Sequence, residues 1–306
     1  MEDYNKIIES LNVKFAKCRN VKILKPFRMD NVRDVENTLV LVNKGAIRLD
    51  LLDDIVQAGE MLFIPAKSNV TLTYGVLAKP MTLTYEAFLN NQDHCYEINR
   101  TDEIKSIENE NYTYLTFDAK IFDSVNFFGN LDIGAFKIRD EKISFLLNSL
   151  FQEEQSPSEG KERATKLLCD MIAIEIIRYI LKKRLFVEQL ATNSTYFKDP
   201  RLINIFTYIR ENIGEDLSNK KLADVADVSE DYVGQYFKML TGINPQDYIE
   251  YQRMEFAVNL LRTTKKSIKE IGNEIGYKDT AYFCRRFKMM FGIPAGKMRR
   301  REITAS

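Results

Sequence analysis

Two stretches near the end of the chain contain side chains whose chemistry suits hydrogen bonding to the edges of DNA bases. Arg285 has a planar fork of donors that matches guanine, Gln235 has an amide that matches adenine, and the Asp231 carboxylate can accept from the amino group of cytosine. Side chains of this kind reach the bases when they lie on the outward face of a helix, close to its capped N-terminus. The elements that position them therefore decide whether this chemistry is available.

The elements around these residues form a pattern that is written twice, fifty residues apart. The segment Phe237–Ile243 reads Phe-Lys-Met-Leu-Thr-Gly-Ile and returns as Phe-Lys-Met-Met-Phe-Gly-Ile at Phe287–Ile293. Ser229 and Asp279 each stand eight residues before the repeated Phe, where a side-chain oxygen caps a helix N-terminus. Each copy therefore predicts a helix, a tight turn and a capped helix, which is a helix-turn-helix unit. We expect these units at about residues 217–240 and 267–290.

The second helix of each unit is predicted to have one apolar and one polar face. The apolar stripes, at spacings of four and three residues, are Val233, Phe237 and Leu240 in the first unit and Phe283, Phe287 and Met290 in the second. The outward residues are Glu230, Asp231, Gly234 and Gln235, and Thr280, Ala281, Cys284 and Arg285. A plain helical repeat with a solvated charged face is the alternative. Two units at this spacing favour DNA reading.

Many spaced positions between Lys221 and Arg299 agree with one known pattern. They are Arg253-Met254…Ala257…Leu260-Leu261, then Ser267-Ile268-Lys269-Glu270-Ile271-Gly272…Ile275-Gly276-Tyr277, then Tyr282-Phe283…Arg285…Phe287-Lys288…Gly292. In these residues the chain resembles the AraC/XylS family of transcription regulators. It departs at the end, where the usual Gly-x-Ser-Pro-x-x-Tyr-Arg is replaced by Gly292-Ile293-Pro294-Ala295-Gly296-Lys297-Met298-Arg299.

The resemblance implies which positions meet DNA. Those that correspond to base-reading positions of the family are Asp231, Gly234, Gln235, Thr280, Ala281, Tyr282 and Arg285. Ser229 and Asp279 cap helices whose N-terminal N–H groups can face phosphate. Further phosphate candidates are Lys238, Arg286, Lys288, Arg299, Arg300 and Arg301. The resemblance also implies double-stranded DNA and RNA polymerase as partners, a homodimer, and activation rather than repression.

The balance of charge differs between the two units. The whole chain has 44 basic and 44 acidic residues, so its net charge says nothing about partners. From Arg262 to Ser306, however, twelve Lys and Arg residues face four Asp and Glu residues, whereas from Lys198 to Leu261 seven face eleven. We therefore expect the second unit to supply most of the attraction for phosphate.

A continuous helix is predicted between the two units, from Pro245 to Leu261, with proline in its first turn. About 16 residues make a rod of roughly 24 Å. Such a rod holds two recognition helices at a fixed separation, so that one chain could occupy successive major-groove faces about one DNA turn, ~34 Å, apart.

The first part of the chain shows the period of β-strands. Strand-like runs at Thr38–Val42, Ala46–Leu51, Met61–Pro65, Thr71–Tyr74 and Met81–Phe88 are separated by turn residues such as Asn43-Lys44-Gly45 and Gln57-Ala58-Gly59-Glu60. Short strands at this spacing predict a β-barrel or sandwich. Together with the family resemblance, this pattern leads us to expect a cupin-like sensor barrel. Its ligand-lining candidates are Phe27, Phe63, Tyr74 and Tyr85.

A metal-dependent cupin enzyme with an accessory DNA-binding domain is a competing hypothesis. His94 is the only histidine in the chain, so no multi-histidine metal site can be assembled. The same lack of bases excludes Ser–His and Cys–His pairs. The sequence therefore predicts no catalytic residue, no metal and no cofactor. Two hypotheses remain for the barrel, binding of a small-molecule effector or binding of a protein partner.

Helical periodicity follows, from Asp140 to Glu154 and from Lys161 to Lys183. The second of these helices is apolar on more than one side, so it must be covered broadly. Packing on the barrel and formation of a homodimer interface both satisfy this, and they are compatible. The predicted domains are a sensor at 1–135, a helical dimerisation segment and linker at 136–197, and an all-α DNA-binding domain at 198–306.

Cysteine spacing and hydropathy bear on the compartment. Cys18, Cys95, Cys169 and Cys284 share no close spacing, which indicates reduced thiols rather than a disulfide framework or a zinc site. The N-terminus is polar and acidic, and no uncharged apolar run approaches the ~20 residues that span a bilayer. We expect a soluble cytoplasmic protein.

Overall fold

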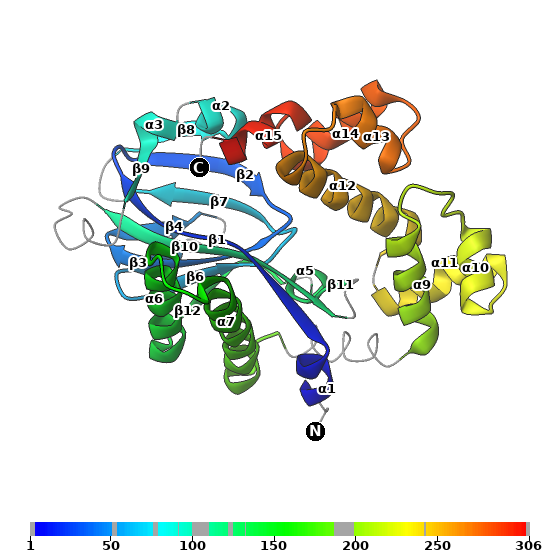
Figure 1. Ribbon diagram of the computed structural model, residues 1–306, viewed down its shortest axis with the longest axis horizontal. Coiled ribbons are helices and arrows are strands. Elements are labelled where there is room, and N and C mark those ends of the chain that lie inside the picture. The colour runs from blue at the N-terminus through cyan, green and yellow to red at the C-terminus, as the bar shows by residue number, and fades with distance from the viewer. Residues whose placement is uncertain are drawn as a thin grey trace. The chain divides into compact units, whose positions relative to one another are not determined.

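The chain forms two compact units (Figure 1). The computed structural model describes residues 4–50, 54–75, 79–90, 92–99, 110–121, 125–131, 133–186, 199–241 and 243–303. We name the unit made of residues 11–120 and 126–187 the β-rich unit. The unit made of residues 1–10, 121–125 and 188–306 is the helical unit.

Within the described residues, the strands form a seven-stranded and a five-stranded sheet. The first has the order β12-β6-β3-β10-β1-β9, with β11 beside β10, and the second has the order β5-β4-β7-β2-β8. The strands are β1 (Leu11–Ile23), β2 (Phe27–Arg33), β3 (Asn37–Lys44), β4 (Ala46–Leu49), β5 (Asp54–Gln57), β6 (Met61–Ile64), β7 (Asn69–Tyr74), β8 (Met81–Thr84), β9 (Tyr96–Asn99), β10 (Asn111–Ile121), β11 (Val125–Asn126) and β12 (Phe136–Ile138).

Tight turns join the strands where the sequence predicts them. Gly45 separates β3 from β4 with φ 95°, and Gly59 precedes β6 with φ 86°. Both angles lie in the left-handed region that glycine adopts without steric cost. At Gly45 a side chain is excluded a second time, because a Cβ there would meet the Glu110 side chain at 2.5 Å.

The strand expected at Met81–Phe88 is wrong in its second half. β8 ends at Thr84, and α2 (Tyr85–Asn90) begins immediately. The Thr84 hydroxyl accepts from the backbone N–H of Ala87 at 3.1 Å, which stabilises the start of the helix. The helix also carries Phe88 onto the ring of Phe27, with centroids 5.2 Å apart. Two long strands, β1 and β10, were not predicted.

Two longer helices complete the β-rich unit and confirm the predicted helical segments. α6 (Glu141–Gln155) is capped by Asp140, which accepts from the N–H groups of Lys142 and Ile143. α7 (Lys161–Lys183) packs against α6 and against β1 (Figure 1). Shorter helices are α1 (Tyr4–Glu9) in the helical unit, and α3 (Gln92–Cys95) and α5 (Phe127–Asn130) in the β-rich unit.

The helical unit contains the helices of both predicted helix-turn-helix units, the predicted helix between them, and one further helix on either side. They are α9 (Pro200–Glu211), α10 (Asn219–Ala226), α11 (Glu230–Thr241), α12 (Pro245–Thr263), α13 (Ile268–Glu274), α14 (Thr280–Phe291) and α15 (Ala295–Ile303). α12 is continuous, as predicted, and two residues longer than expected. Its 19 residues correspond to a rod of roughly 28 Å.

The predicted fold class is confirmed as a β-rich part followed by an all-α helix-turn-helix part. The cupin-like barrel holds only loosely, because the described strands lie in two separate sheets that do not close into one barrel. The domain limits 1–135, 136–197 and 198–306 stay predictions. No helix within the described residues has the length and apolar character that crossing a membrane requires.

Candidate nucleic-acid interface

The first helix-turn-helix unit consists of α10, a tight turn and α11. Asp227 ends α10 in the left-handed region, with φ 53° and ψ 49°, a conformation that aspartate adopts more readily than most residues. The carbonyl of Ser229 accepts from the N–H of Val233 at 3.0 Å, so Ser229 stands at the N-cap position of α11. The turn thus directs α11 away from α10.

Packing decides which face of α11 points outward. Val233, Tyr236 and Phe237 are buried in a core shared with α9 and the start of α12. The rings of Phe206, Phe237 and Tyr248 lie in mutual contact in that core, with centroids 5.1–5.6 Å apart. The opposite face carries the predicted base-reading residues. Asp231 and Gln235 are exposed, and Gly234 is half-buried, so that a Cβ added there would lie 3.7 Å from the Asn219 side-chain nitrogen.

The second unit consists of α13, a turn through Gly276 and α14. Gly276 has φ 87°, in the left-handed region that glycine adopts without steric cost. The carboxylate of Asp279 caps α14 and accepts from the N–H groups of Ala281 and Tyr282, at 2.7 and 3.1 Å. This confirms the predicted cap. It also occupies two N–H groups at this helix end, which are therefore not available to a phosphate.

α14 presents the other predicted base-reading residues opposite a buried aromatic stripe. Phe283, Phe287 and Phe291 are buried, with successive centroids 5.8 and 4.7 Å apart. Ala281, Tyr282 and Arg285 are exposed, and Thr280 is half-buried. The guanidinium carbon of Arg285 lies 5.9 Å from the centre of the Tyr282 ring, within cation–π range. The ring therefore favours one orientation of the arginine.

The predicted phosphate contacts have different surroundings. Lys238 and Lys288 are exposed on α11 and α14. Arg286 instead faces α12, where its Nε donates to Glu250 Oε1 at 2.6 Å and its Nη2 donates to Glu250 Oε2. Arg299 donates to the backbone carbonyl of Lys266. The side chains of Arg300 and Arg301 lie outside the described residues.

The first helix of the second unit is held by a capping box. The Ser267 hydroxyl accepts from the N–H of Glu270, and the Glu270 carboxylate accepts from the N–H of Ser267 at 2.6 Å. This backbone hydrogen bond, together with one to the Ser267 side chain, lowers the pKa of Glu270.

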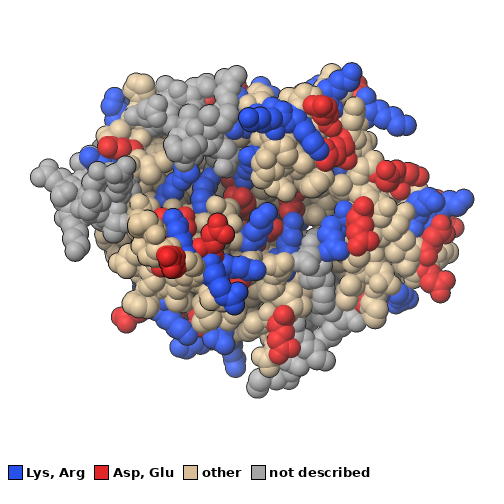
Figure 2. All heavy atoms as spheres, in the orientation of Figure 1, with Lys and Arg blue, Asp and Glu red and all other residues tan. Residues whose placement is uncertain are grey.

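Basic and acidic side chains are interspersed on the face of the molecule that Figure 2 shows, so no patch of a single sign dominates it.

The predicted ligand-lining residues of the β-rich unit do not form one set. Phe27 and Tyr74 are neighbours in β2 and β7, and their rings stack with centroids 4.9 Å apart. Phe63 lies in the other sheet, among Phe117, Phe128 and Phe136. Phe27, Tyr74 and Phe63 are all buried as core, and burial raises the pKa of Tyr74 to about 12. The side chain of Tyr85 lies outside the described residues.

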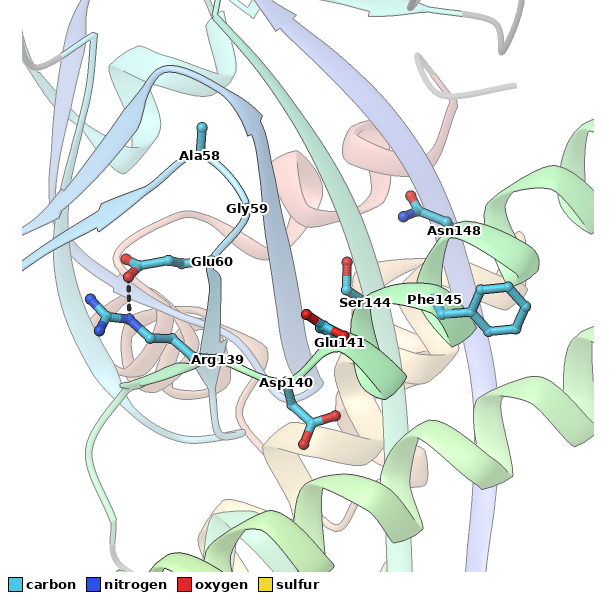
Figure 3. A pocket seen from close by; sticks show the side chains of 9 residues that line it. All are labelled: Ala58, Gly59, Glu60, Arg139, Asp140, Glu141, Ser144, Phe145 and Asn148. Carbon is cyan, nitrogen blue, oxygen red and sulfur yellow. Dashed lines mark hydrogen bonds and ion pairs between the residues drawn. The ribbon is translucent and has the colours of Figure 1, made fainter.

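An open cavity of about 620 Å³ lies elsewhere in the β-rich unit, between the turn before β6 and the start of α6 (Figure 3). The Arg139 guanidinium is paired with the Glu60 carboxylate on one side of it, and the Phe145 ring stands at its other end (Figure 3). The remaining lining residues are Ala58, Gly59, Asp140, Glu141, Ser144 and Asn148. Sequence reasoning missed this cavity, and periodicity alone could not bring the two segments together.

The residues that bear on the enzyme hypothesis are dispersed. His94 is exposed in α3. Among the residues that the structure describes, no group of three His, Cys, Asp or Glu side chains is placed to hold a metal ion. All four cysteines are free thiols, and burial raises the pKa of Cys18 and of Cys169.

Comparison with known proteins gives a family for this region. Residues 222–301 match a family model described as a helix-turn-helix domain. An uncharacterized HTH-type transcriptional regulator of Haemophilus influenzae is 24% identical over 53% of this chain and 53% of its own length. The HTH-type transcriptional activator RhaS of Enterobacter sp. is 28% identical over 49% of this chain and 51% of its own length. The chain thus spans about half the length of these relatives.

A solved structure resembles nearly the whole chain. An apo form of ToxT from Vibrio cholerae superposes with a TM-score of 0.52 over 95% of this chain and 97% of its own, at 12% identity. At this identity the likeness concerns the fold alone. A β-rich part followed by a helical part is thus common to both chains.

Proposed function

Because this chain belongs to the AraC/XylS family through the helix-turn-helix region at residues 222–301, we propose that it is a sequence-specific DNA-binding transcription regulator. One observation carries this proposal. Two recognition helices, α11 and α14, each present polar side chains opposite a buried aromatic core, and one continuous helix, α12, lies between them in the chain.

The length of α12 suits a tandem reader. A rod of roughly 28 Å is comparable with one turn of DNA, ~34 Å, so the two units can enter successive major grooves on one face of the duplex. One chain then reads two half-elements without a partner chain. In the second element Arg285 would pair with guanine, while Gln235 and Asp231 would read adenine and cytosine in the first.

The charge of the second unit supports a division of work between the two units. Its basic excess would supply most of the phosphate attraction, so the second half-element contributes more affinity and more of the salt dependence. Lys288 on α14 and Lys238 on α11 remain our candidates for phosphate contacts. Arg286 and Arg299 must first release their present partners, or keep them and contact phosphate through their remaining donors.

We propose activation, with RNA polymerase as the partner, on the ground that a relative of this chain is named a transcriptional activator. Transcription from a promoter bearing the selected site, with purified polymerase, tests this. An increase on adding the protein supports activation, and a decrease would identify a repressor.

The β-rich unit is proposed to act as the sensor. The open cavity beside Glu60 and Arg139 is our candidate site for a small-molecule effector. An effector regulates only if it binds the DNA-competent and incompetent states differently. A protein partner is the second candidate. A thermal shift by a small molecule, lost in Arg139→Ala, would decide for the effector.

The outer face of α7 supports a homodimer. Ala164, Leu167, Met171, Ile174 and Leu181 follow a heptad spacing that the exposed Arg178 interrupts, and they are exposed or half-buried, Leu167 being 53% exposed. The opposite face packs into the β-rich unit through residues such as Cys169, Ile172 and Ile176. Light scattering of Leu167→Glu, with Lys166→Glu as the exposed control, tests the interface. Only Leu167→Glu should give monomers.

Selection of random duplex DNA on the full-length protein tests the proposed function as a whole. We expect a motif with two half-elements about one helical turn apart. If neither the full chain nor its residues 199–303 enrich any sequence, α11 and α14 do not read DNA. Enrichment by the fragment alone would mean that the rest of the chain restrains DNA binding.

A further inference from the structure

The two helix-turn-helix units are joined by more than the length of α12. The middle of α12 carries Glu250 and Arg253, three residues apart and so on neighbouring turns of one helix side. Their side chains reach in different directions. Arg253 binds the loop between α9 and α10, which belongs to the first unit, and Glu250 binds the turn and the recognition helix of the second.

Arg253 holds the first unit through two backbone carbonyls. Its Nε donates to Ile213 O at 3.0 Å and its Nη2 to Glu215 O at 2.8 Å. Ile213 itself packs against the hydrophobic core of the first unit. A guanidinium that donates to two carbonyls of one loop fixes the loop in both position and orientation.

Glu250 holds the second unit through its recognition helix. Both of its oxygens accept from Arg286 on α14, and Oε1 also accepts from the Tyr277 hydroxyl at 3.3 Å. The pair is partly shielded from water, since the side chains are 22% and 31% exposed. Hydrogen bonds from a bidentate arginine are directional, so they restrict rotation of α14 relative to α12.

The backbones of the two helix-turn-helix units also meet directly. A Cβ added at Gly214, in the loop of the first unit, would lie 2.4 Å from the carbonyl oxygen of Glu274 in the second. A Cβ at Gly276 would lie 2.9 Å from both Gly214 O and the Arg253 guanidinium. Only glycine therefore permits this approach, which leaves no room for sliding between the units.

We propose that Glu250, Arg253 and the contact of Gly214 with the second unit fix the two recognition helices as one rigid reader, and so determine the spacing of the two DNA half-elements that this protein accepts. The inference rests on the proposed DNA-reading function and adds a specificity that no base-contacting residue carries. None of these three residues is a predicted DNA contact. They are positioning residues, which act on DNA only through α11 and α14.

A panel of duplexes tests this in the full-length protein. The panel contains the selected site, versions with one or two base pairs added to or removed from its spacer, and a single second half-element. A one-base-pair change rotates and shifts one element relative to the other, so a rigid reader loses at least one good base contact. We expect wild-type affinity to fall roughly 5- to 150-fold at each such step.

The variants are Glu250→Gln, Arg253→Met and Gly214→Ala. In Gly214→Ala the two backbones must separate by about 1 Å to reach an ordinary contact distance. We expect each variant to bind the single half-element as wild type does, to bind the selected site several-fold more weakly, and to show a flatter dependence on spacer length. Flexibly joined units tolerate more spacings because the second binding event is less preorganised.

We call the contacts made by Glu250, Arg253 and Gly214 the joint. Matched controls separate the effect of losing the joint from general effects of substitution. Gly296→Ala adds a methyl group in α15 where nothing lies within 4 Å. Glu211→Gln removes the carboxylate of a solvent-exposed pair with Arg210 on α9. Both should keep the wild-type spacing profile. A variant that is merely misfolded loses the single half-element as well, and Gly214→Ala, which removes no hydrogen bond, provides the independent second case.

The outcomes are distinguishable. Wild type with a sharp spacing optimum and variants with an equally sharp one would overturn the joint while the DNA-reading function stands. Wild type with no spacing optimum would overturn it as well. If wild type selects no sequence at all, the proposed function fails, and the joint fails with it.

Discussion

Replacement of Arg285 by alanine gives the sharpest test of base reading. The residue is exposed on α14, and three buried phenylalanines on the opposite face hold the helix in place. Asp279 caps the first turn, so the helix should persist when the arginine is removed. Arg285→Ala thus removes a guanidinium without removing its support.

The expected magnitude follows from the contact that is lost. A bidentate arginine–guanine pair discriminates by ~1–3 kcal/mol, which corresponds to a roughly 5- to 150-fold loss of affinity for the preferred base. Tyr282 orients Arg285 from 5.9 Å, and such an exposed cation–π contact contributes ~0.5–1 kcal/mol. A double-mutant cycle between Tyr282→Ala and Arg285→Ala, measured on the free energy of binding to the preferred duplex, should therefore give a coupling energy of that size.

The assay is equilibrium binding to four duplexes that differ at one position of the second half-element. Wild type should prefer guanine there, and Arg285→Ala should bind all four alike. Arg210→Ala removes an exposed arginine of α9 that is not among the predicted DNA contacts, so it serves as the control and should keep the preference.

Salt titration identifies the result that would refute base reading. A phosphate contact weakens all four duplexes equally and lowers the slope of log K against log salt by ~0.9 when it is removed. If Arg285→Ala behaves in this way, the residue touches only phosphate, and the orientation we assign to α14 is incorrect.

Three further predictions concern the stability of the second helix-turn-helix unit. Phe283→Ala should cost ~3–5 kcal/mol of unfolding free energy in denaturant titration, because the ring is fully buried, whereas Phe145→Ala, 69% exposed, should change it little. Asp279→Ala should cost ~1 kcal/mol and lower the melting temperature, while Asp279→Asn retains an acceptor and most of the stability; equal losses would show that the cap is unimportant. The pKa of Glu270 is lowered in the folded protein, so its contribution to stability is complete above the ordinary pKa of 4.5 and is lost as pH falls through the lowered folded value. Below pH 4.5 the melting temperature should therefore decrease more steeply with falling pH for wild type than for Glu270→Gln.

Local signals explain why the helical unit could be predicted closely. Apolar periodicity, the cap at Asp279 and the left-handed positions at Asp227 and Gly276 each act within a few residues of chain. These features identify the helices and turns of both helix-turn-helix units from neighbouring residues alone. The outward faces of α11 and α14 follow from them directly.

The joint between the units could not be found in this way. Arg253 reaches carbonyls 38 and 40 residues away, and Glu250 pairs with an arginine 36 residues away. From its position on α14 alone, Arg286 is predicted only as a phosphate contact, and its pairing with Glu250 is not. Nothing in the sequence near Glu250 or Gly214 signals that these segments meet.

The β-rich unit was predicted less completely, because its strands pair over long separations. Phe27 alternates with polar residues and Phe63 stands in an apolar run, but neither pattern could show that the two residues belong to different sheets. The long strands β1 and β10 were also not predicted. For β10 the reason is that residues 111–121 lie beyond the region where turn residues recur. The helix at Tyr85 depends on where Phe88 packs, which is again a tertiary effect.

Methylation interference and hydroxyl-radical footprinting of the full-length protein on its selected site test the central claim most directly. Methyl groups on guanine N7 project into the major groove, where α11 and α14 are proposed to lie. We expect interference and backbone protection in two clusters on one face of the duplex, about 10 base pairs apart. A single cluster, or backbone protection without interference in the major groove, would contradict a reader that uses both helices.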